Sequence, residues 1–479
     1  MPALNRSLKW LSLCTIFVLC FALRVGVGAA VDAAVPVIKR ADVYSDIAAN
    51  LTRGHGFVAE PGGAPIMWRA PLYPAFLAVL YALFGEHNET AVFVAQSALD
   101  AITAMLIFYL GARLFSESVG LVSALIFALH PLSAYYSLRF LSEPLFTLAF
   151  TAAIAAWIVA VRVRRVMAYL AVGALIALAA LVKPVALGLW PLLMACACYQ
   201  LRREPRRALS AAIAWTIACL MVLAPWAARN YRLTGELVAV ATGGGYALWL
   251  GNQMVSEGLE DWEVDESTRA HLIERRDVVL APAGSSDRPL VSVSDRATIR
   301  SATEPVYITV QEDHAFSLAA WREIASHPFD SALLTVRKVF RFWFRIFLPD
   351  NRWAQPSIVL FQTVFLALAV MGMLEARRQG GILLPLMVPI IFLTAAHALT
   401  FATIRYSIPA LPVMTLLMTV GLRVVVHRLN ERWGVSLGLS WLRWLRAAPS
   451  GVSASLYRET PFMMRPARMK DSDGSKSCV

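Results

Sequence analysis

The sequence predicts an all-α polytopic membrane protein, because apolar segments long enough to cross a bilayer recur along the chain and basic clusters separate them. Of the 479 residues, 58% are hydrophobic and only 16% are charged, and the mean hydropathy is +0.59. A soluble domain carries about a quarter charged residues. We therefore expect lipid to be the main solvent of this chain.

The chain is strongly basic, with a net charge of +12 and a pI of about 9.7. Its Lys and Arg residues stand in short clusters between apolar runs, which is typical of topology signals and not of a nucleic-acid interface. No groove-reading or base-stacking motif accompanies them, so we expect no nucleic-acid partner. Five of the six cysteines lie in apolar stretches and Cys478 lies in the tail, which argues against a disulfide framework.

The first apolar segment runs from Trp10 to Val31 and follows a short basic start with Arg6 and Lys9. It is longer than the apolar part of a cleavable signal peptide and contains Arg24, so we interpret it as a signal anchor. Further spans of about 20 residues are expected at 91–112, 118–137, 142–161, 166–182, 184–199, 208–226, 354–374, 381–401 and 407–426. The sequence thus predicts about ten transmembrane helices.

Four basic clusters test this topology, because Lys and Arg in short loops stay on the cytoplasmic side. If the spans alternate, all four fall on the side of the N-terminus: Arg162, Arg164 and Arg165; Arg202, Arg203, Arg206 and Arg207; Arg377 and Arg378; and Arg423, Arg428 and Arg432. The prediction is a multi-pass protein of the plasma or inner membrane with both termini in the cytoplasm.

This topology divides the chain into six parts. They are an N-terminal tail with the first span (1–31), a first extracytoplasmic loop (32–90), six spans (91–226), a large extracytoplasmic loop (227–353), three spans (354–426) and a basic cytoplasmic tail (427–479). We expect the chemistry of the protein in the two extracytoplasmic loops, because they carry polar residues away from the topology signals.

The first of these loops contains two predicted helices. Apolar residues from Val43 to Leu51 recur at helical spacing and stop at Gly54, and a second short helix, 72–84, follows Pro71. Both are too short or too polar to span a bilayer, so we expect them to lie along the interface.

The large loop is mixed in character. An acidic patch between Glu257 and Glu266 precedes a Ser- and Pro-rich middle, and one helical stretch is expected at 315–347. Trp343 and Phe344 near its end suit the aromatic belt of a membrane interface.

Two carboxylates stand out on the predicted extracytoplasmic side. Asp42 opens the first loop helix, where an N-cap role is the alternative, and Glu143 begins the fourth span, where an acid is also favoured by the helix dipole. Inside the membrane, Arg24 and Asp100 lie at similar predicted depth. An ion pair between them is the simplest interpretation, and a polar cavity lining is the other.

Five basic residues share that side, namely Arg69, Arg139, Lys183, Arg229 and Arg405. Each alone is compatible with a snorkelling anchor. Five together oppose the positive-inside tendency, so we expect them to include contacts to a phosphate.

Two other patterns are weaker indications of function. The stretch Thr242-Gly-Gly-Gly-Tyr246 lacks the Lys-Ser/Thr end of a P-loop, and it is either a turn that lets backbone approach a ligand or a plain surface turn. The eight histidines show no metal-ligand spacing.

A resemblance to a known family rests on motifs in a fixed order: Asp42-Val-Tyr44 with Ile47-Ala48, Arg69-Ala-Pro-Leu-Tyr-Pro74, Leu141-Ser-Glu-Pro144, Pro225-Trp226 with Arg229-Asn-Tyr231, Gly244-Gly-Tyr246 with Leu248-Trp-Leu-Gly-Asn252, and Arg405-Tyr406. The chain resembles the polyprenyl-phosphate-sugar-dependent glycosyltransferases of the GT-C fold, in the protein mannosyltransferase and aminoarabinose transferase group. The likeness covers residues 10–255 well and 315–426 more loosely.

The resemblance implies a GT-C-like bundle with interfacial helices and assigns roles to residues. Asp42 looks like the active-site carboxylate and Glu143 like a second, supporting acid. Many relatives place their acid further ahead of the tyrosine, so Asp46 is the second choice for the base. The expected substrate contacts are Tyr44, Arg69, Arg139, Lys183, Arg229, Asn230, Arg405 and Tyr406.

The function implied is transfer of a monosaccharide from a polyprenyl-phosphate donor to an extracytoplasmic lipid, protein or glycan acceptor. A carboxylate would deprotonate the acceptor, Arg or Lys would stabilise the leaving phosphate, and inversion at the anomeric centre is implied by the family. No cofactor is firmly implied, and a divalent metal stays open. The alternatives are a secondary transporter or lipid flippase of the envelope, which the lack of an inverted repeat disfavours, and a noncatalytic scaffold.

Overall fold

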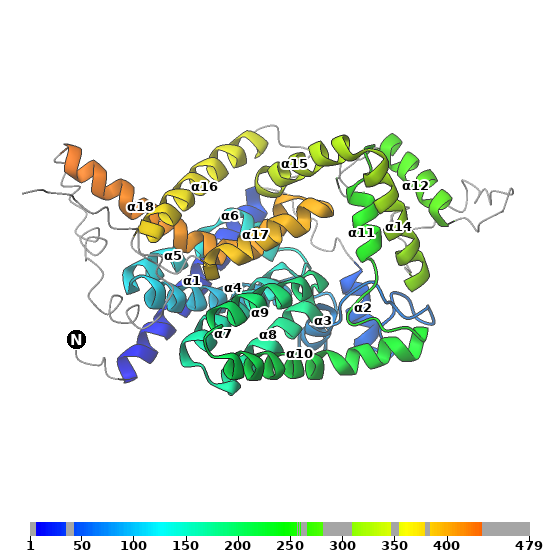
Figure 1. Cartoon of the computed structure of the whole chain (residues 1–479), viewed down its shortest axis with the longest axis horizontal. Coiled ribbons are helices and arrows are strands. Elements are labelled where there is room, and N and C mark those ends of the chain that lie inside the picture. The colour runs from blue at the N-terminus through cyan, green and yellow to red at the C-terminus, as the bar shows by residue number, and fades with distance from the viewer. Residues whose placement is uncertain are drawn as a thin grey trace, which may run out of the picture.

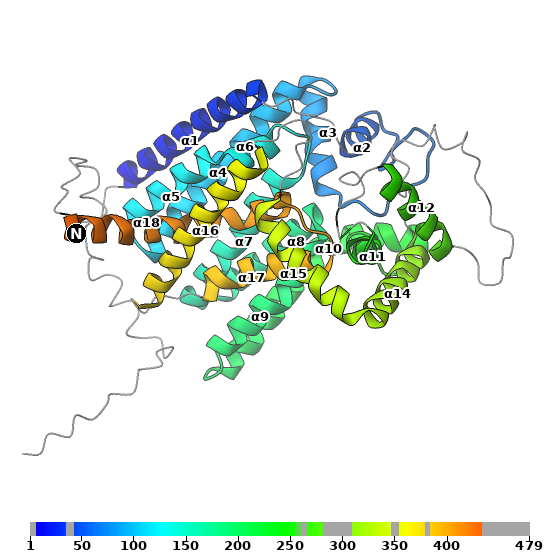
Figure 2. The ribbon, with the colours of Figure 1, turned by 90° about the horizontal axis from the view of Figure 1, so that it is seen from above.

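The computed structural model describes residues 6–34, 43–255, 257, 259, 266–280, 309–345, 354–378 and 384–433. Within these ranges the chain is helical and has no strand, as the sequence predicts. The longer helices form a bundle, and a group of shorter ones lies at one end of it (Figures 1 and 2). That end, which we call the loop end, contains α2 (Tyr44–Thr52), α11 (Gly244–Gly251), α12 (Glu266–Leu280) and α14 (Val310–Ser326).

Each predicted span corresponds to helical structure. The ten segments are α1 (Arg6–Ala34), α4 (Glu89–Leu114), α5 (Glu117–Leu129) with α6 (Pro131–Ser137), α7 (Glu143–Val163), α8 (Val166–Val182), η1 (Pro184–Gly188) with α9 (Leu189–Gln200), α10 (Pro205–Thr234), α16 (Ala354–Arg378), α17 (Leu384–Leu399), and η3 (Ile404–Ala410) with α18 (Leu411–Trp433). The two helices predicted in the first loop are α2 and α3 (Leu72–Phe84), and their place at the membrane interface stays a prediction.

The described helices mark the chain as an integral membrane protein. Six of them are long and apolar enough to cross a membrane, and a seventh crossing results if the bent pair α5 and α6 is one span. The apolar helices α8 and α17 and the pair η1 and α9 are shorter. Ten crossings, and the side on which each terminus lies, stay predictions.

The bend of 55° between α5 and α6 is fixed by the buried Arg24. Pro131 has no N–H to continue the helix, so Phe127 O lacks its regular helical donor and accepts from His130 N at 3.2 Å instead. The Arg24 guanidinium donates to Phe127 O at 2.7 Å and to His130 O at 3.1 Å, and its Nε lies 3.1 Å from Asp100 Oδ2. The predicted ion pair is therefore confirmed, and Arg24 also caps a broken helix.

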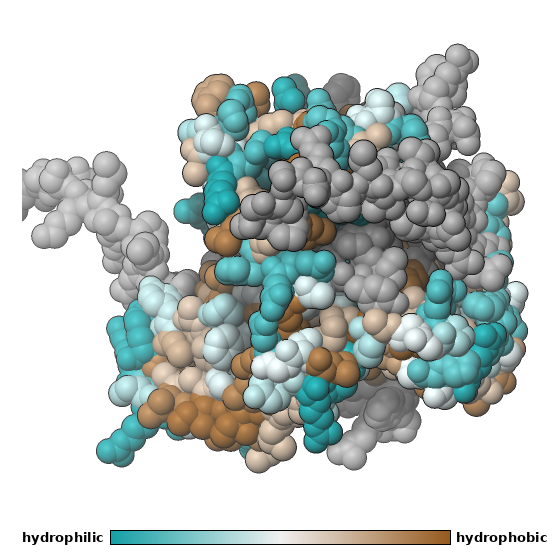
Figure 3. All heavy atoms as spheres, turned by 90° about the vertical axis from the view of Figure 1, so that its right-hand side faces the viewer, coloured by the Kyte–Doolittle hydropathy of each residue, from teal (hydrophilic) through white to brown (hydrophobic). Residues whose placement is uncertain are grey.

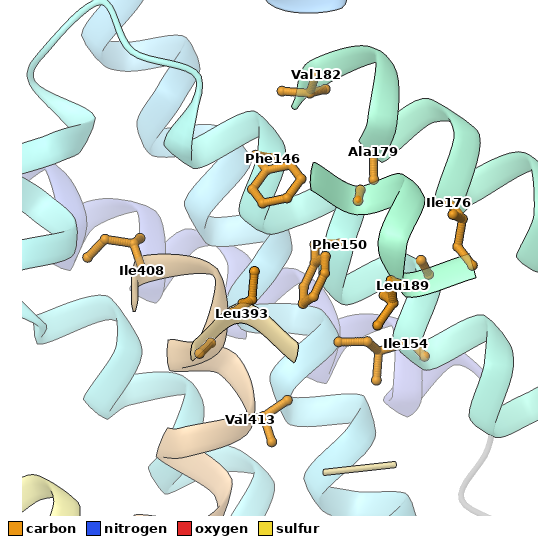
Figure 4. Close-up of a cluster of buried hydrophobic side chains, with 14 of the residues drawn as sticks. Phe146, Phe150, Ile154, Ile176, Ala179, Val182, Leu189, Leu393, Ile408 and Val413 are labelled. Atoms are coloured by element: carbon orange, nitrogen blue, oxygen red, sulfur yellow. The ribbon is translucent and has the colours of Figure 1, made fainter. Parts of the chain in front are cut away.

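The core of the bundle surrounds α7. Figure 4 shows Phe146, Phe150 and Ile154 of α7 packed among apolar side chains of α8, α9, α17, η3 and α18. Because α7 is held on several sides, its first residue, Glu143, has a fixed position at the edge of this core.

The helical stretch predicted at 315–347 consists of two helices in the structure, which describes it as far as Arg345. The first, α14, begins earlier, at Val310, behind a capping box formed by Thr309 and Glu312. The second, α15 (Pro328–Phe344), starts at a proline, and the turn between them lies at His327. Proline fits the first turn of a helix but not the interior, which explains the break.

The glycine stretch before Tyr246 is neither of the two turns considered from the sequence, since it begins α11. Gly243 has φ +98°, and a Cβ on Gly245 would lie 1.9 Å from Asp313 O on α14. Asp313 also accepts a hydrogen bond from Tyr246 N at 3.0 Å. These glycines therefore let α11 pack directly on the backbone of α14.

Candidate functional site

Glu143 is the centre of a buried ion cluster. Its Oε1 accepts a hydrogen bond from Lys183 Nζ at 2.6 Å and another from Arg405 Nε. The carboxylate side chain is 1% exposed, and each of the two cationic side chains is 13% exposed. We call these three residues the Glu143 site.

The fold explains why residues so distant in sequence meet. Glu143 opens α7 and Lys183 follows the last residue of α8, and these helices pack against each other, so both residues lie at one end of the pair. Pro184 prevents α8 from continuing past Lys183. Arg405 reaches the same place because η3 packs on α7.

Aromatic rings line the two cations. The Tyr406 ring lies 5.1 Å from Lys183 Nζ and 5.6 Å from the Arg405 guanidinium carbon, and Phe146 lies 5.7 Å from Lys183 Nζ. His397 stacks on Tyr406 with ring centroids 4.2 Å apart. Cation–π contacts of this kind hold charged groups in place where water is scarce.

The Glu143 site combines one carboxylate with two cations. Both cationic side chains keep part of their surface accessible. Arg and Lys side chains that are fixed in this way suit a phosphate oxygen, because charge-assisted hydrogen bonds are strong and need no reorganisation.

A second cluster forms around Arg69. Its guanidinium carbon lies 3.8 Å from the Trp68 ring and 5.2 Å from the Tyr44 ring, and Tyr44 packs edge-on against Tyr73 with ring centroids 5.1 Å apart. The structure therefore brings together two of the predicted binding residues of the first loop.

Gln96 links the first loop to the segment that leads into Glu143. Its Oε1 accepts from Tyr73 OH at 2.9 Å, and its Nε2 donates to the carbonyls of Ser137 and Arg139, both at 2.8 Å. Gln96 is fully buried, and its bonds to Tyr73 and Ser137 are buried too. The Arg139 side chain lies near the Tyr135 ring, 5.9 Å from its centroid.

Arg229 and Asn230 hydrogen-bond to the chain itself. Arg229 donates to Ile66 O at 3.1 Å, and Asn230 Nδ2 donates to Val238 O at 3.0 Å and to Val240 O at 3.1 Å. These bonds tie α10 to two loops, which is a structural role. Substrate contact by either residue stays a prediction.

Asp42, the predicted base, lies outside the described residues, as does most of the acidic patch after Glu257. Val43 is the N-cap residue of α2, and Asp46, the second choice for the base, lies in its first turn. In the described part of the chain, no group of three or more His, Cys, Asp or Glu side chains could hold a metal ion.

The sequence interpretation missed three residues that shape the site, namely Gln96, Phe146 and His397. Gln96 lies four residues before Asp100 on a helix expected in the membrane, and this spacing puts both polar groups on one face. Phe146 lies three residues after Glu143 on α7. His397, near the end of an apolar segment, carries no comparable signal.

Comparison with known proteins gives one family match. Residues 68–228 match the family model of dolichyl-phosphate-mannose-protein mannosyltransferase. This range includes Glu143 and Lys183 but not Arg405. No curated protein matches the chain in sequence.

Solved structures share the fold at low sequence identity. The archaeal oligosaccharyltransferase AglB from Archaeoglobus fulgidus, in complex with an inhibitory peptide and a dolichol-phosphate, matches with a TM-score of 0.52 and 12% identity over 91% of this chain and 54% of its own. The apo form of the Archaeoglobus fulgidus oligosaccharyltransferase matches with a TM-score of 0.52 and 13% identity over 89% and 52%.

ArnT from Cupriavidus metallidurans, bound to undecaprenyl phosphate, matches with a TM-score of 0.38 and 14% identity over 86% of this chain and 79% of its own. The chain spans about half the length of the oligosaccharyltransferase chains. It has the GT-C fold of the oligosaccharyltransferase structures, as the sequence predicts.

Proposed function

We propose that this chain is a glycosyltransferase that moves a monosaccharide from a polyprenyl-phosphate donor to a lipid, protein or glycan acceptor on the extracytoplasmic side of a membrane. The family match, the GT-C fold and the apolar helices support this assignment. The description of the matched family names dolichyl-phosphate-mannose, and one AglB structure contains dolichol-phosphate.

The observation that carries the proposal is the pair of cations fixed on one buried carboxylate. Lys183 and Arg405 would receive the donor phosphate, and Glu143 would keep both pointing at it. A donor whose phosphate is attached to a long lipid must be met near the membrane surface, and both cations lie at the ends of apolar helices. Arg69 and Arg139 are further candidates for the sugar-phosphate.

The proposed reaction is a single displacement. The acceptor oxygen attacks the anomeric carbon, the bond from that carbon to the phosphate oxygen breaks, and the electron pair leaves with the polyprenyl phosphate. The acceptor proton passes to Asp42, or to Asp46 if Asp42 is not the base. Lys183 and Arg405 stabilise the charge that grows on the leaving phosphate, and the product has the inverted anomeric configuration.

The test is transfer in membranes supplied with a polyprenyl phosphate that carries a radiolabelled sugar. Replacing Arg405→Met should reduce the labelled product at least tenfold, which corresponds to about 1.4 kcal/mol of lost transition-state stabilisation. The matched control is Arg428→Met, an exposed arginine of α18. Equal products from both variants would reject the assignment of Arg405.

The transporter or flippase alternative predicts a different outcome. Proteoliposomes would then move a labelled lipid or sugar across the bilayer with no covalent product. A labelled product formed by the native chain in detergent, where no transport across a bilayer is possible, separates the two functions.

A further inference from the structure

Helix α15 carries an apolar stripe that the described chain leaves exposed. Phe329, Leu333, Val336 and Phe340 recur at intervals of four, three and four residues, and all four are exposed. This spacing puts them on one side of the helix. A contiguous exposed apolar surface of this kind usually contacts another protein surface or a membrane.

The opposite face of α15 fixes the rotation of the helix. Leu334, Lys338 and Phe342 are buried there. Lys338 Nζ donates to Gly251 O at 3.1 Å and to Asn252 Oδ1 at 3.2 Å. Turning the stripe inward would break these bonds and leave a buried ammonium without acceptors, so the stripe must face away from the protein.

The stripe leads directly to a membrane span. Gln355 in the first turn of α16 donates to Phe344 O at 2.8 Å, which joins the end of α15 to the start of this candidate span. The span exposes Leu360 and Val364 on its own outer surface. Figure 1 shows α15 along the upper edge of the molecule between α16 and α14.

Another helix of the loop end shows what a water-facing surface of this chain looks like. On α12, Val278 is 65% exposed, nearly the same as Val336 at 66%. Its neighbours on the surface are charged, namely Glu274 and Asp277. Figure 3 looks onto the loop end and shows hydrophilic residues over much of its coloured surface.

We propose that α15 lies in the lipid leaflet at the loop end, with Phe329, Leu333, Val336 and Phe340 among the acyl chains. The bilayer is thus the partner of this surface, as for other amphipathic interfacial helices. Arg345 O at the end of α15 accepts from Ile404 N at 3.1 Å, one residue before Arg405. A helix held by lipid therefore also sets the height of η3 relative to the headgroups. The proposal does not depend on sugar transfer.

The experiment compares the two matched valines in the full-length chain. Val336→Cys and Val278→Cys are each introduced into a variant with the six native cysteines replaced, labelled with a nitroxide and placed in phosphatidylcholine nanodiscs. Oxygen concentrates in lipid, whereas a nickel chelate stays in water. We expect the ratio of oxygen to nickel collisions to be several-fold higher at 336 than at 278.

Equal ratios at the two positions would overturn the proposal, since the stripe would then face water. Spin–spin broadening at 336 that vanishes on dilution with unlabelled chain would overturn it too, because a second copy would cover the stripe. If the cysteine-free variant does not fold, the native protein is photo-crosslinked in bilayers that contain a phospholipid with a photoreactive acyl chain. Lipid adducts on the peptide around Val336, and none around Val278, are expected, and the reverse would refute the proposal.

Discussion

Replacing Glu143→Gln keeps the shape of the side chain and removes its charge. In the structure the carboxylate lies 2.6 Å from Lys183 Nζ, which corresponds to an attraction of about 6 kcal/mol at an effective dielectric constant of roughly 20. Desolvation of the charges offsets part of this attraction. We expect a net loss of about 3–5 kcal/mol, the usual cost of removing one partner of a buried ion pair.

The measurement is thermal unfolding of the purified chain, followed as loss of the monodisperse fraction, together with transfer in membranes. A double-mutant cycle with Lys183→Met isolates the pair. The single change Lys183→Met should cost less, because Glu143 keeps Arg405 as a partner. The double variant should lose less stability than the two single variants lose in sum. Without the Glu143 charge, Lys183 and Arg405 repel each other, and the double variant removes Lys183.

Glu204 provides a matched control, because it also pairs with two arginines, Arg164 and Arg207. Its side chain is 32% exposed, and ion pairs at such positions contribute about 0–1 kcal/mol. Glu204→Gln should therefore unfold nearly as the native chain does. Equal losses from Glu143→Gln and Glu204→Gln, or additive losses in the cycle, would refute the reasoning.

Three further predictions concern the base, the loop end and the bundle. Asp42→Asn should abolish transfer while expression and membrane insertion stay normal; full activity would reject Asp42 as the base and move attention to Asp46→Asn. Burial, with the charge of Arg341 nearby, lowers the pKa of Lys338 from 10.5 to about 8. Between these values the unfolded chain binds more protons, so the contribution of Lys338 to stability rises with pH. The unfolding temperature of the native chain should then rise relative to that of Lys338→Met between pH 8 and pH 10, and parallel pH curves would contradict the expectation. Gly372→Ala should cost about 1–3 kcal/mol, because its Cβ would lie 1.8 Å from Leu417 O, whereas Gly26→Ala, with nothing within 4 Å, is the control; equal unfolding temperatures for the two would show that α16 and α18 can separate without cost.

The bundle could be predicted from sequence because lipid imposes simple rules. Backbone groups in the membrane must bond within a helix, so long apolar runs give helices without any tertiary information. Breaks depend on more local chemistry. His130-Pro131 bends a predicted span by 55°, and Pro328 divides a predicted helix into α14 and α15. Both prolines were visible in the sequence, but how sharply the chain turns depends on partners such as Arg24.

The sequence singled out the three charged residues of the Glu143 site but not the contacts between them. Glu143 and Lys183 stood out because charged groups beside lipid are costly, so they usually have an ion-pair partner or a function. That one carboxylate holds both Lys183 and Arg405 follows from the packing of η3 on α7, a contact between segments 262 residues apart. Arg229 had the same sequence signal, yet its hydrogen bonds go to Ile66 O and the Met67 sulfur in the first loop and to Asn230 Oδ1 beside it. Residue type and topology cannot distinguish Arg229 from Lys183 and Arg405. The three side chains differ in which acceptor groups the folded chain places beside them.

The acceptors of Lys338 also impose an order of assembly. The carbonyl of Gly251 precedes this lysine in the chain, whereas that of Leu399, 3.4 Å from Nζ, belongs to a helix made 61 residues later. During synthesis, Lys338 therefore lacks one of its acceptors until α17 has been made. Helix α15 therefore gains its last acceptor only when α17 is present, and a chain truncated before Leu384 should hold α15 less firmly.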